Sequence, residues 1–253
     1  MNKDNLILSI AGHDPSGGAG LQVDAMVARL FNKHLLSIVT CKTIQSPRSF
    51  NKVLPSNNQY IRDSFNILKS EFPLNFLKIG LIPNIEVAKA ISKLISNEKK
   101  LVLVIDPIQK AGTGKRFFTK KDYQFLLENV YLYSELITPN IEEVKALGGK
   151  KNIYDSISYL NDKGIKNIYV TGDVVKGKII NRLFSKNELI EESESDFYEN
   201  KVHGTGCAIS MAILCYLSSG DSLEVACKKS HSLMNNLVKN SYTNKSQNIL
   251  NFS

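Results

Sequence analysis

The amino-acid sequence predicts an α/β fold with a mostly parallel central sheet. Residues 6–11 form an apolar run, a loop rich in glycine follows, and residues 21–31 carry apolar side chains at helical spacing. Residues 101–105 are apolar throughout, which is typical of a parallel strand covered on both faces. A strand, a glycine-rich loop and a helix in this order place the loop at the carboxyl end of the strand, where open parallel sheets bind ligands.

The other elements follow from the same patterns of hydrophobicity and turn residues. We expect strands at residues 35–41, 76–80, 134–138 and 168–170, a β-ribbon at 178–184 and 188–190, and helices at 58–72, 85–95, 141–147, 153–160, 208–217 and 223–238. Residues 42–56 contain two prolines and little periodicity, so they predict a lid or small flap. We expect residues 191–200 to form an acidic loop and the tail from residue 240 to fray. No repeat or linker divides residues 1–253, so we expect one domain.

Composition excludes several classes of protein. The chain has 253 residues, a hydrophobic content of 43% and a net charge of +8, but its lysines occur as scattered pairs among acidic residues. Such pairs are typical of solvated faces, so we expect neither a nucleic-acid nor a membrane partner. The four cysteines show no spacing typical of zinc sites or disulfide frameworks. With no signal-peptide pattern and no run long enough to span a bilayer, we expect a cytoplasmic protein with free thiols.

A second glycine-rich segment precedes an apolar helix at residues 208–217 and has the sequence His203-Gly204-Thr205-Gly206-Cys207. The first N–H groups of a helix have no intrahelical partner and carry the positive end of its dipole, so glycines there let an anion approach closely. Cys207 falls in the first turn, where we expect a lowered thiol pKa. An anion site beside a base predicts phosphoryl transfer. An ordinary glycine turn before a core helix is the alternative.

Neither of the other glycine-containing segments matches a common nucleotide or hydrolase motif. The loop at residues 12–20 lacks both the dinucleotide-binding pattern and the nucleophile elbow of hydrolases. Residues 111–116 resemble a P-loop, but Gln109 and Arg116 stand where that motif needs glycine and a hydroxyl residue, which leaves a mobile basic loop near phosphates. Asp24, in the first turns after the first loop, either faces the same crevice or is an exposed acid favoured by the helix dipole.

Polar residues follow three of the predicted strands. Gln45 can donate to and accept from a heteroaromatic ring, or it is a solvent-exposed loop residue. Asp106 ends a buried strand and can hold Mg²⁺ through water, or it caps the next segment. Asn140 and Glu143 have the spacing of a capping box, and the functional interpretation is that both face Mg²⁺-bound phosphates.

Residues 11–24 closely resemble the opening of the hydroxymethylpyrimidine/phosphomethylpyrimidine kinases of thiamine biosynthesis, in the ribokinase-like superfamily. Further matches follow in the order of that family and span roughly residues 6 to 218. They are Gln45, Lys78-Ile79-Gly80-Leu81, Asp106-Pro107, Ile137-Thr138-Pro139-Asn140 with Glu143, and His203-Gly204-Thr205-Gly206-Cys207.

The resemblance implies a three-layer α/β/α sandwich, ATP and Mg²⁺ as co-substrates, and a homodimer. By resemblance, the transferring phosphoryl group is held by Gly204, Thr205 and Gly206, and Cys207 accepts the proton of the substrate hydroxymethyl group. The pyrimidine pocket contains Gln45, Gly12 and Asp24, the nucleotide site contains Asn140, Glu143, Thr171 and Gly172, and the metal site contains Asp106 and Glu143.

The chain departs from the family pattern at three places. Thr171-Gly172-Asp173 replaces Lys-Gly-Gly, Ile108-Gln109 replaces Val-Met, and the C-terminal signature is absent from residues 240–253. The main hypothesis is an ATP-dependent kinase that phosphorylates 4-amino-5-hydroxymethyl-2-methylpyrimidine and then its monophosphate. The alternatives are a pyridoxal kinase-like activity in vitamin B6 salvage and a pyrimidine-binding module that has lost catalysis.

Overall fold

The computed structural model describes residues 5–46, 49–98, 100–110, 117–198, 202–242 and 248–253. Its strands are β1 (Leu6–His13), β2 (His34–Ser46), β3 (Ser49–Pro55), β4 (Phe76–Ile79), β5 (Val102–Ile105), β6 (Leu136–Ile137), β7 (Asn167–Val175), β8 (Lys178–Ser185), β9 (Glu188–Asp196), β10 (Val202–His203) and β11 (Asn248–Ile249). Its helices are α1 (Gly20–Leu30), α2 (Asn58–Glu71), α3 (Ile85–Ile95), α4 (Lys120–Asn129), α5 (Ile141–Gly148), α6 (Ile153–Asp162), α7 (Thr205–Ser218) and α8 (Leu223–Lys239), with a short 3-10 turn η2 (Tyr131–Tyr133).

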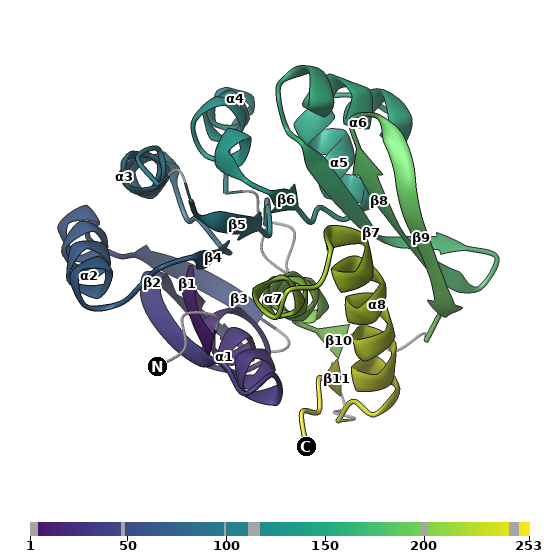
Figure 1. The fold of residues 1–253 in the computed structure, drawn as a ribbon, viewed down its shortest axis with the longest axis horizontal. Helices are drawn as coiled ribbons and strands as arrows, with labels where there is room; N and C mark the ends of the chain where they lie inside the picture. Colours follow the sequence, from purple (N-terminus) through teal and green to yellow (C-terminus); the bar gives the residue numbers. More distant parts are fainter. Residues whose placement is uncertain (1–4, 47–48, 99, 111–116, 199–201, 243–247) are drawn as a thin grey trace.

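The central sheet has the strand order β3-β2-β1-β4-β5-β6-β7-β8-β9 (Figure 1). The strands from β2 to β7 in this order are parallel to their neighbours, whereas β3, β8 and β9 pair antiparallel. The predicted α/β class with a mostly parallel sheet is therefore confirmed.

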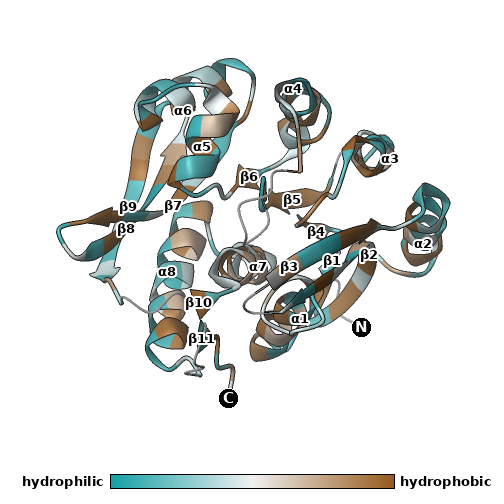
Figure 2. Cartoon of the chain, turned by 180° about the vertical axis from the view of Figure 1, so that it is seen from behind, coloured by the Kyte–Doolittle hydropathy of each residue, from teal (hydrophilic) through white to brown (hydrophobic). Residues whose placement is uncertain are grey.

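Helices cover both faces of this sheet. Helices α1, α7 and α8 lie on one face and α2 to α6 lie on the other (Figure 1). Successive residues of β1 alternate between the two cores, since Ile7 belongs to the α7 side and Leu8 to the α2–α3 side. The central strands are coloured hydrophobic and the outer helices show hydrophilic outer faces (Figure 2). The three-layer sandwich implied by the resemblance is confirmed.

The segment predicted as a lid or flap is a β-hairpin. Strand β2 continues to Ser46 and β3 pairs antiparallel with it, so the hairpin extends from the edge of the main sheet. The register shifts between Ile44 and Gln45, which is a β-bulge, and bulges redirect side chains. The hydroxyl of Thr43 donates to the backbone oxygen of His13 at 3.0 Å and ties the hairpin to the first glycine-rich loop.

Two segments that were expected to be irregular, an acidic loop and the C-terminal tail, contain β-strands instead. The acidic loop expected at residues 191–200 is a strand as far as Asp196, because Glu191 and Ser193 alternate inward and the strand pairs with β8. The tail expected to fray includes β11, which pairs with β10, and Leu250 is only 3% exposed. Helix α4 was not expected, and a capping box between Thr119 and Asp122 starts it.

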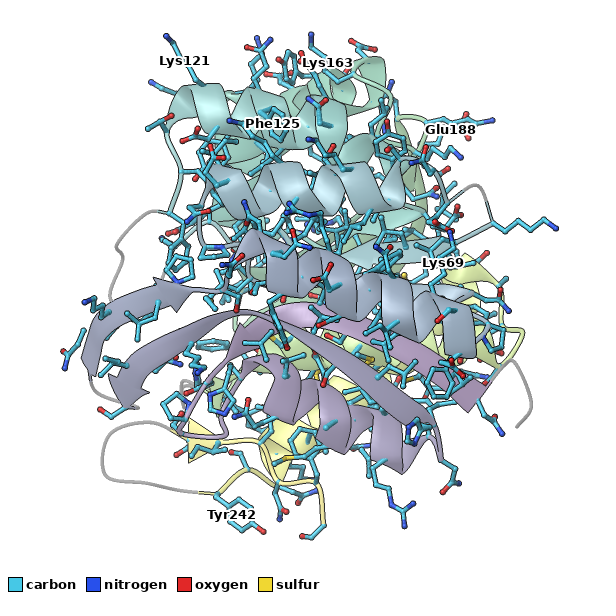
Figure 3. The ribbon with its side chains drawn as sticks, turned by 90° about the vertical axis from the view of Figure 1, so that its left-hand side faces the viewer. Lys69, Lys121, Phe125, Lys163, Glu188 and Tyr242 are labelled. Carbon is cyan, nitrogen blue, oxygen red and sulfur yellow. The ribbon has the colours of Figure 1, made fainter. Side chains whose placement is uncertain are left out.

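Apart from a small buried set that includes Lys78 and Asp24, the charged side chains of the described residues lie toward the outside of the molecule. Lys69, Lys121 and Lys163 extend outward from helices or a helix end, and Glu188 extends outward from the start of β9 (Figure 3). This dispersal agrees with the interpretation of the lysine pairs as solvated faces. Among the described residues, no helix combines the length and apolar character needed to cross a bilayer.

Candidate active site

A cavity of about 320 Å³ opens at the carboxyl ends of the parallel strands. Its walls come from the loop after β1, the β2–β3 hairpin, the ends of β5, β6 and β7, and the first turn of α7. Most of the residues predicted to form the site line it: Gly12, Gln45, Asp106, Asn140, Glu143, Thr171, Gly172, Gly204, Thr205, Gly206 and Cys207. The structure therefore brings together residues from six separate segments of the chain.

The two glycine-rich loops touch through their glycines. Gly204 has a φ of +85°, and a Cβ there would lie 2.0 Å from the backbone oxygen of Gly18. A Cβ on Gly18 would lie 2.5 Å from the His203 ring. Only glycine fits at these two positions, because any side chain would force the loops apart. The imidazole of His203 completes the contact through Nε2, which lies 3.1 Å from the Asp14 carboxylate.

The first turn of α7 presents free backbone N–H groups to the cavity. The N-cap residue Gly204 supplies no side-chain cap, and the first intrahelical bond joins Ala208 N–H to Gly204 O at 2.9 Å. The N–H groups of Thr205, Gly206 and Cys207 therefore have no partner within the helix, and all three residues line the cavity. These unpaired donors at a cavity wall are what the predicted anion site requires.

The predicted thiolate at Cys207 is wrong for the unliganded protein. Burial raises the pKa of the Cys207 thiol far above its ordinary value. The nearby Lys78 ammonium lowers this pKa, but the carboxylates of Asp106 and Asp24 raise it further. The expectation considered only the helix terminus, whereas burial and two neighbouring carboxylates decide the outcome. The thiol is therefore protonated, and it hydrogen-bonds Asp106.

Two carboxylates face this end of the cavity. Burial raises the pKa of Asp106 to about 6, and burial together with the charge of Asp106 raises the pKa of Glu143 to about 8. The Oδ2 atom of Asp106 is buried with no hydrogen-bond partner among the described residues. Two adjacent carboxyl groups with raised pKa values and an unpartnered oxygen fit a site that a cation completes.

Asn140 and Glu143 form the capping box that their spacing predicted. The Oδ1 atom of Asn140 accepts from the backbone N–H of Glu142 and of Glu143, both at 3.0 Å. In return, Oε2 of Glu143 accepts from the backbone N–H of Asn140 at 2.9 Å. The structural interpretation is confirmed, and the cap holds the Glu143 carboxyl group at the cavity wall.

Asp24 does not line the cavity, contrary to both interpretations of the sequence. It is fully buried behind the wall, where it forms an ion pair with Lys78 and accepts from the Ser9 hydroxyl at 2.6 Å. The Lys78 ammonium also donates to the backbone oxygen of Cys207 at 3.0 Å. A buried charge needs a compensating partner, and this pair connects the sheet to the first turn of α7.

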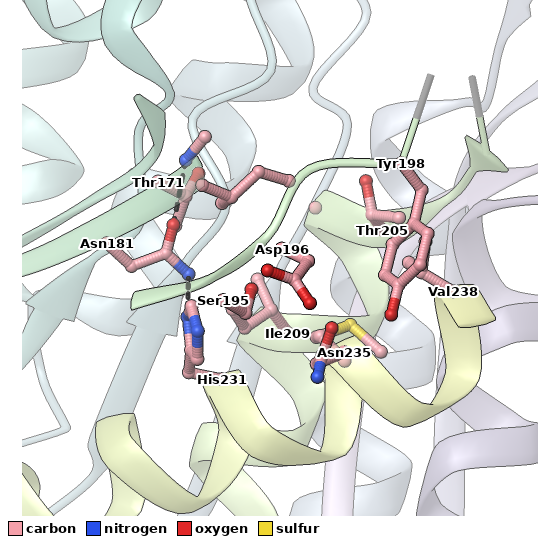
Figure 4. A pocket seen from close by; sticks show the side chains of 14 residues that line it. Thr171, Asn181, Ser195, Asp196, Tyr198, Thr205, Ile209, His231, Asn235 and Val238 are labelled. Carbon is pink, nitrogen blue, oxygen red and sulfur yellow. Dashed lines mark hydrogen bonds between the residues drawn. The ribbon is translucent and has the colours of Figure 1, made fainter. Parts of the chain in front are cut away.

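A second cavity of about 140 Å³ lies between strands β7–β9 and helices α7–α8 (Figure 4). Its apolar walls are Ile179, Ile209, Met234 and Val238, and it shares Thr171, Gly172, Thr205 and Gly206 with the first cavity. The two cavities therefore meet at the first turn of α7.

One hydrogen-bonded chain links the wall of the second cavity to its junction with the first. Asn181 accepts from the Gly172 backbone N–H at 2.8 Å and contacts Nδ1 of His231 at 3.0 Å (Figure 4). Burial lowers the pKa of His231, which keeps its ring neutral and lets Nδ1 accept from the Asn181 amide.

Comparison with known proteins identifies the family. The family model described as phosphomethylpyrimidine kinase matches residues 14–250. The chain belongs to the phosphomethylpyrimidine kinase family. Within it, a hydroxymethylpyrimidine/phosphomethylpyrimidine kinase of Aquifex aeolicus is 28% identical over 93% of this chain and 95% of the relative. Membership confirms the predicted class of enzyme, an ATP-dependent kinase.

Solved structures confirm the ribokinase-like fold. A Bacillus subtilis pyridoxal kinase in an ADP complex matches with a TM-score of 0.88 at 24% identity, over 98% of this chain and 97% of that chain. A phosphomethylpyrimidine kinase from Clostridium difficile matches with a TM-score of 0.78 at 24% identity, over 92% and 99% of the two chains.

The residues at which this member of the phosphomethylpyrimidine kinase family departs from the family pattern lie in different places in the structure. Ile108 lines the first cavity, whereas the Gln109 amide turns away and donates to the backbone oxygen of Glu143 at 2.9 Å. Asp173, where the family pattern has glycine, accepts from Arg182 at 2.5 Å. The basic segment predicted at residues 111–116 lies outside the described residues.

Several site residues were not singled out by the sequence. Asp14 and Thr43 line the first cavity, and Asn181 and His231 line the second. Asp14 lies inside the first glycine-rich motif, so its position in the sequence could have indicated that it belongs to the site. Asn181 and His231 have no local motif, and only the packing of β8 against α8 places them beside Gly172.

Proposed function

We propose that this chain is a kinase that transfers the γ-phosphoryl group of ATP to the hydroxymethyl oxygen of 4-amino-5-hydroxymethyl-2-methylpyrimidine, and then to the phosphate of that product. The observation that carries the proposal is the junction of two cavities at the first turn of α7, where three backbone N–H groups have no partner within the helix. The smaller cavity has apolar walls that suit a nucleotide base, and the larger one contains Gln45 and Asp14. A nucleotide and a small acceptor in these cavities would meet at the first turn of α7.

Transfer at this junction depends on positioning and on charge stabilisation. The N–H groups of Thr205, Gly206 and Cys207 would hold the transferring phosphoryl group, because they are the unpaired donors of α7. A Cβ on Gly206 would lie 3.7 Å from Asp106, an ordinary contact distance, and would occupy part of the space between the helix and that carboxylate. The Asp106 carboxylate in turn hydrogen-bonds the thiol of Cys207.

This arrangement provides proton acceptors for the hydroxyl group of the acceptor substrate. Cys207 would accept the proton as its own thiol proton passes to the carboxylate oxygen of Asp106 that the thiol hydrogen-bonds, which leaves the unpartnered Oδ2 for a cation. Because the thiol begins protonated, this relay replaces the free thiolate that the sequence led us to expect. Lys78 stays behind the pair and offsets its negative charge.

Asp106 and Glu143 are the residues that would hold Mg²⁺. Among the described residues, no group of three or more His, Cys, Asp or Glu side chains is arranged to hold a metal. Mg²⁺ usually takes one or two protein carboxylates and completes its shell with water and phosphate oxygens, so two carboxylates suffice. When bound, Mg²⁺ would neutralise charge on the phosphate oxygens during transfer. The wider proposal is a cytoplasmic homodimer, as the family resemblance implies.

A pair of cavity variants tests the assignment of the two substrates. Met234→Trp fills the smaller cavity and should raise KM for ATP at least about 10-fold while leaving KM for the pyrimidine within about 2-fold. Gln45→Met, in the larger cavity, should do the reverse. The proposal fails if either variant changes both KM values together, or if the unmodified protein releases no ADP in the presence of either pyrimidine.

A further inference from the structure

Among the described residues that line the two cavities, Lys110 is the only lysine or arginine. It belongs to the wall of the larger cavity, which also carries the carboxyl groups of Asp14, Asp106 and Glu143. A phosphate group brings negative charge into this cavity, so a cation on the wall favours its binding. The position of Lys110 therefore bears directly on which ligands the larger cavity accepts.

The backbone beside Lys110 is held against helix α5. The Gln109 side chain donates to the backbone oxygen of Glu143 at 2.9 Å, and the backbone oxygen of Gln109 accepts from the Phe117 N–H at 3.0 Å. Ile108, on the same short segment, lines the larger cavity. The start of the Lys110 side chain is therefore fixed beside the cavity, while its ammonium group sits at the end of a flexible four-carbon stem.

The Lys110 ammonium forms an ion pair with the Glu142 carboxylate. Glu142 lies in the first turn of α5 but does not line the larger cavity, and its side chain is 72% exposed. Exposed ion pairs of this kind are weak. A lysine and a phosphate group form a stronger, charge-assisted hydrogen bond, so a phosphate in the cavity can take Lys110 from Glu142.

We propose that Lys110 is a specificity-determining residue that exchanges Glu142 for a phosphate group in the larger cavity, and that this group is the phosphate of the monophosphate acceptor. Lys110 lines the cavity assigned to the acceptor and not the smaller one assigned to the nucleotide base. It therefore favours the second phosphorylation, because the hydroxymethylpyrimidine carries no phosphate. The inference rests on the proposed function, since it concerns the acceptor of that same reaction.

The test compares kcat/KM for the monophosphate with kcat/KM for the hydroxymethylpyrimidine at saturating Mg-ATP. Lys110→Met should lower the first value by about 10- to 100-fold and the second by no more than about 2-fold. Lys110→Arg keeps the charge and should retain most of the activity on the monophosphate. Lys89→Met is the matched control, because it breaks an exposed ion pair with Glu86 on helix α3, which lines neither cavity, and it should change neither value.

A double-mutant comparison tests the exchange itself. Glu142→Gln removes the competing carboxylate and should raise kcat/KM for the monophosphate by about 2- to 5-fold. The gain should disappear when Lys110 is already methionine, because Glu142 then holds no lysine. An equal gain in both backgrounds would mean that Glu142 repels the phosphate directly, and would overturn the inference. If Lys110→Met does not fold in thermal unfolding, the absence of a gain in Glu142→Gln alone overturns it.

The nucleotide is the other source of phosphate, and the two acceptors separate it from the monophosphate. Equal losses with both acceptors in Lys110→Met, together with a raised KM for ATP, would assign Lys110 to the phosphates of ATP and overturn the inference. Unchanged kcat/KM values with both acceptors would also overturn it, since Lys110 would then form only a surface ion pair.

Failure of the proposed function has a different signature. If the unmodified protein releases no ADP with either acceptor, the kinase assignment fails, and calorimetry with the monophosphate then tests Lys110 independently of turnover. Weaker binding of the monophosphate by Lys110→Met than by the unmodified protein would support the inference. Equal binding by the two proteins, or no binding by either, would contradict it.

Discussion

The ammonium group of Lys78 donates a 3.0 Å hydrogen bond to the backbone oxygen of Cys207, although the two residues lie 129 positions apart in the chain. Lys78 also forms an ion pair with Asp24, and neither side chain is exposed. The same lysine therefore holds the first turn of α7 in place and compensates the carboxylate behind the active site.

Lys78→Met should destabilise the protein by about 3–5 kcal/mol, because it leaves the Asp24 carboxylate buried without its cation. The double variant Lys78→Met with Asp24→Leu removes both charges and should recover most of this free energy of unfolding. Urea denaturation of the two variants and the unmodified protein measures the difference. If the double variant is as unstable as the single one, the ion pair is not the cause.

Cys207 should react slowly with thiol reagents in the unliganded enzyme. Burial raises the pKa of its thiol, and only a thiolate is readily alkylated. We expect iodoacetamide at pH 7.5 to label Cys207 at least about 100-fold more slowly than in the urea-unfolded chain, as measured by mass spectrometry of its peptide. If Cys207 is alkylated as fast in the folded protein as in the unfolded chain, its thiol is ionised near neutral pH, as the sequence alone predicted.

Cys207→Ala should lose most turnover while ATP binding is retained, because the proton of the acceptor hydroxyl then has no path to Asp106. Single-turnover kinetics and nucleotide binding by calorimetry separate the two effects. Near-normal turnover in this variant would exclude the assigned role.

Gly206→Ala and Gly204→Ala should have different effects. At Gly206 a Cβ makes only ordinary contact with the protein, the nearest atom being 3.7 Å away, but it enters the anion site. We expect kcat to fall by about 10²- to 10³-fold with little change in Tm. At Gly204 the φ of +85° and the 2.0 Å approach to Gly18 O predict a large loss of Tm instead. Similar stability losses in both variants would argue against an anion site.

The stability of the unliganded protein should fall as the pH rises from about 5 to about 8. Burial and the charge of Asp106 raise the pKa of Glu143 to about 8, so the folded state binds this proton more tightly than the unfolded state does. The stability that this proton contributes is present below the unfolded pKa and is lost as the pH rises through the folded one. Glu143→Gln keeps a side-chain oxygen to cap Asn140 and removes the titration.

Relative to Glu143→Gln, the unmodified protein should lose roughly 1–3 kcal/mol over this pH range. Chemical denaturation at several pH values in the absence of metal and nucleotide measures the difference. Parallel pH profiles for the two proteins would mean that Glu143 titrates normally. Adding Mg²⁺ with a nucleotide should reduce the slope, because a cation replaces the proton.

The sequence predicted those parts of the site that are formed by residues close together in the chain. The glycines of the two loops and the capping box from Asn140 to Glu143 are local patterns, and the structure contains each of them. The fold was predictable for a similar reason, since apolar runs such as residues 101–105 mark buried parallel strands.

The parts that failed depend on contacts between distant segments. The sequence predicts that Asp24 either faces the crevice or is an exposed acid, and both interpretations fail because nothing local indicates that Lys78, 54 positions away, pairs with it. Cys207 was expected to ionise because a helix terminus is visible in the sequence, whereas burial and neighbouring carboxylates are not. The acidic segment ending at Asp196 was expected to be a loop. Acidic residues occupy both buried and exposed positions of this strand, so hydrophobicity alone does not show the alternation.

The most direct test of the account is ADP release from Mg-ATP with three acceptors assayed in parallel: the hydroxymethylpyrimidine, its monophosphate and pyridoxal. We expect turnover with both pyrimidines and much weaker turnover with pyridoxal, because Gln45 lines the larger cavity and its amide can pair with an aminopyrimidine. Turnover with pyridoxal alone, or with none of the three, would contradict the account.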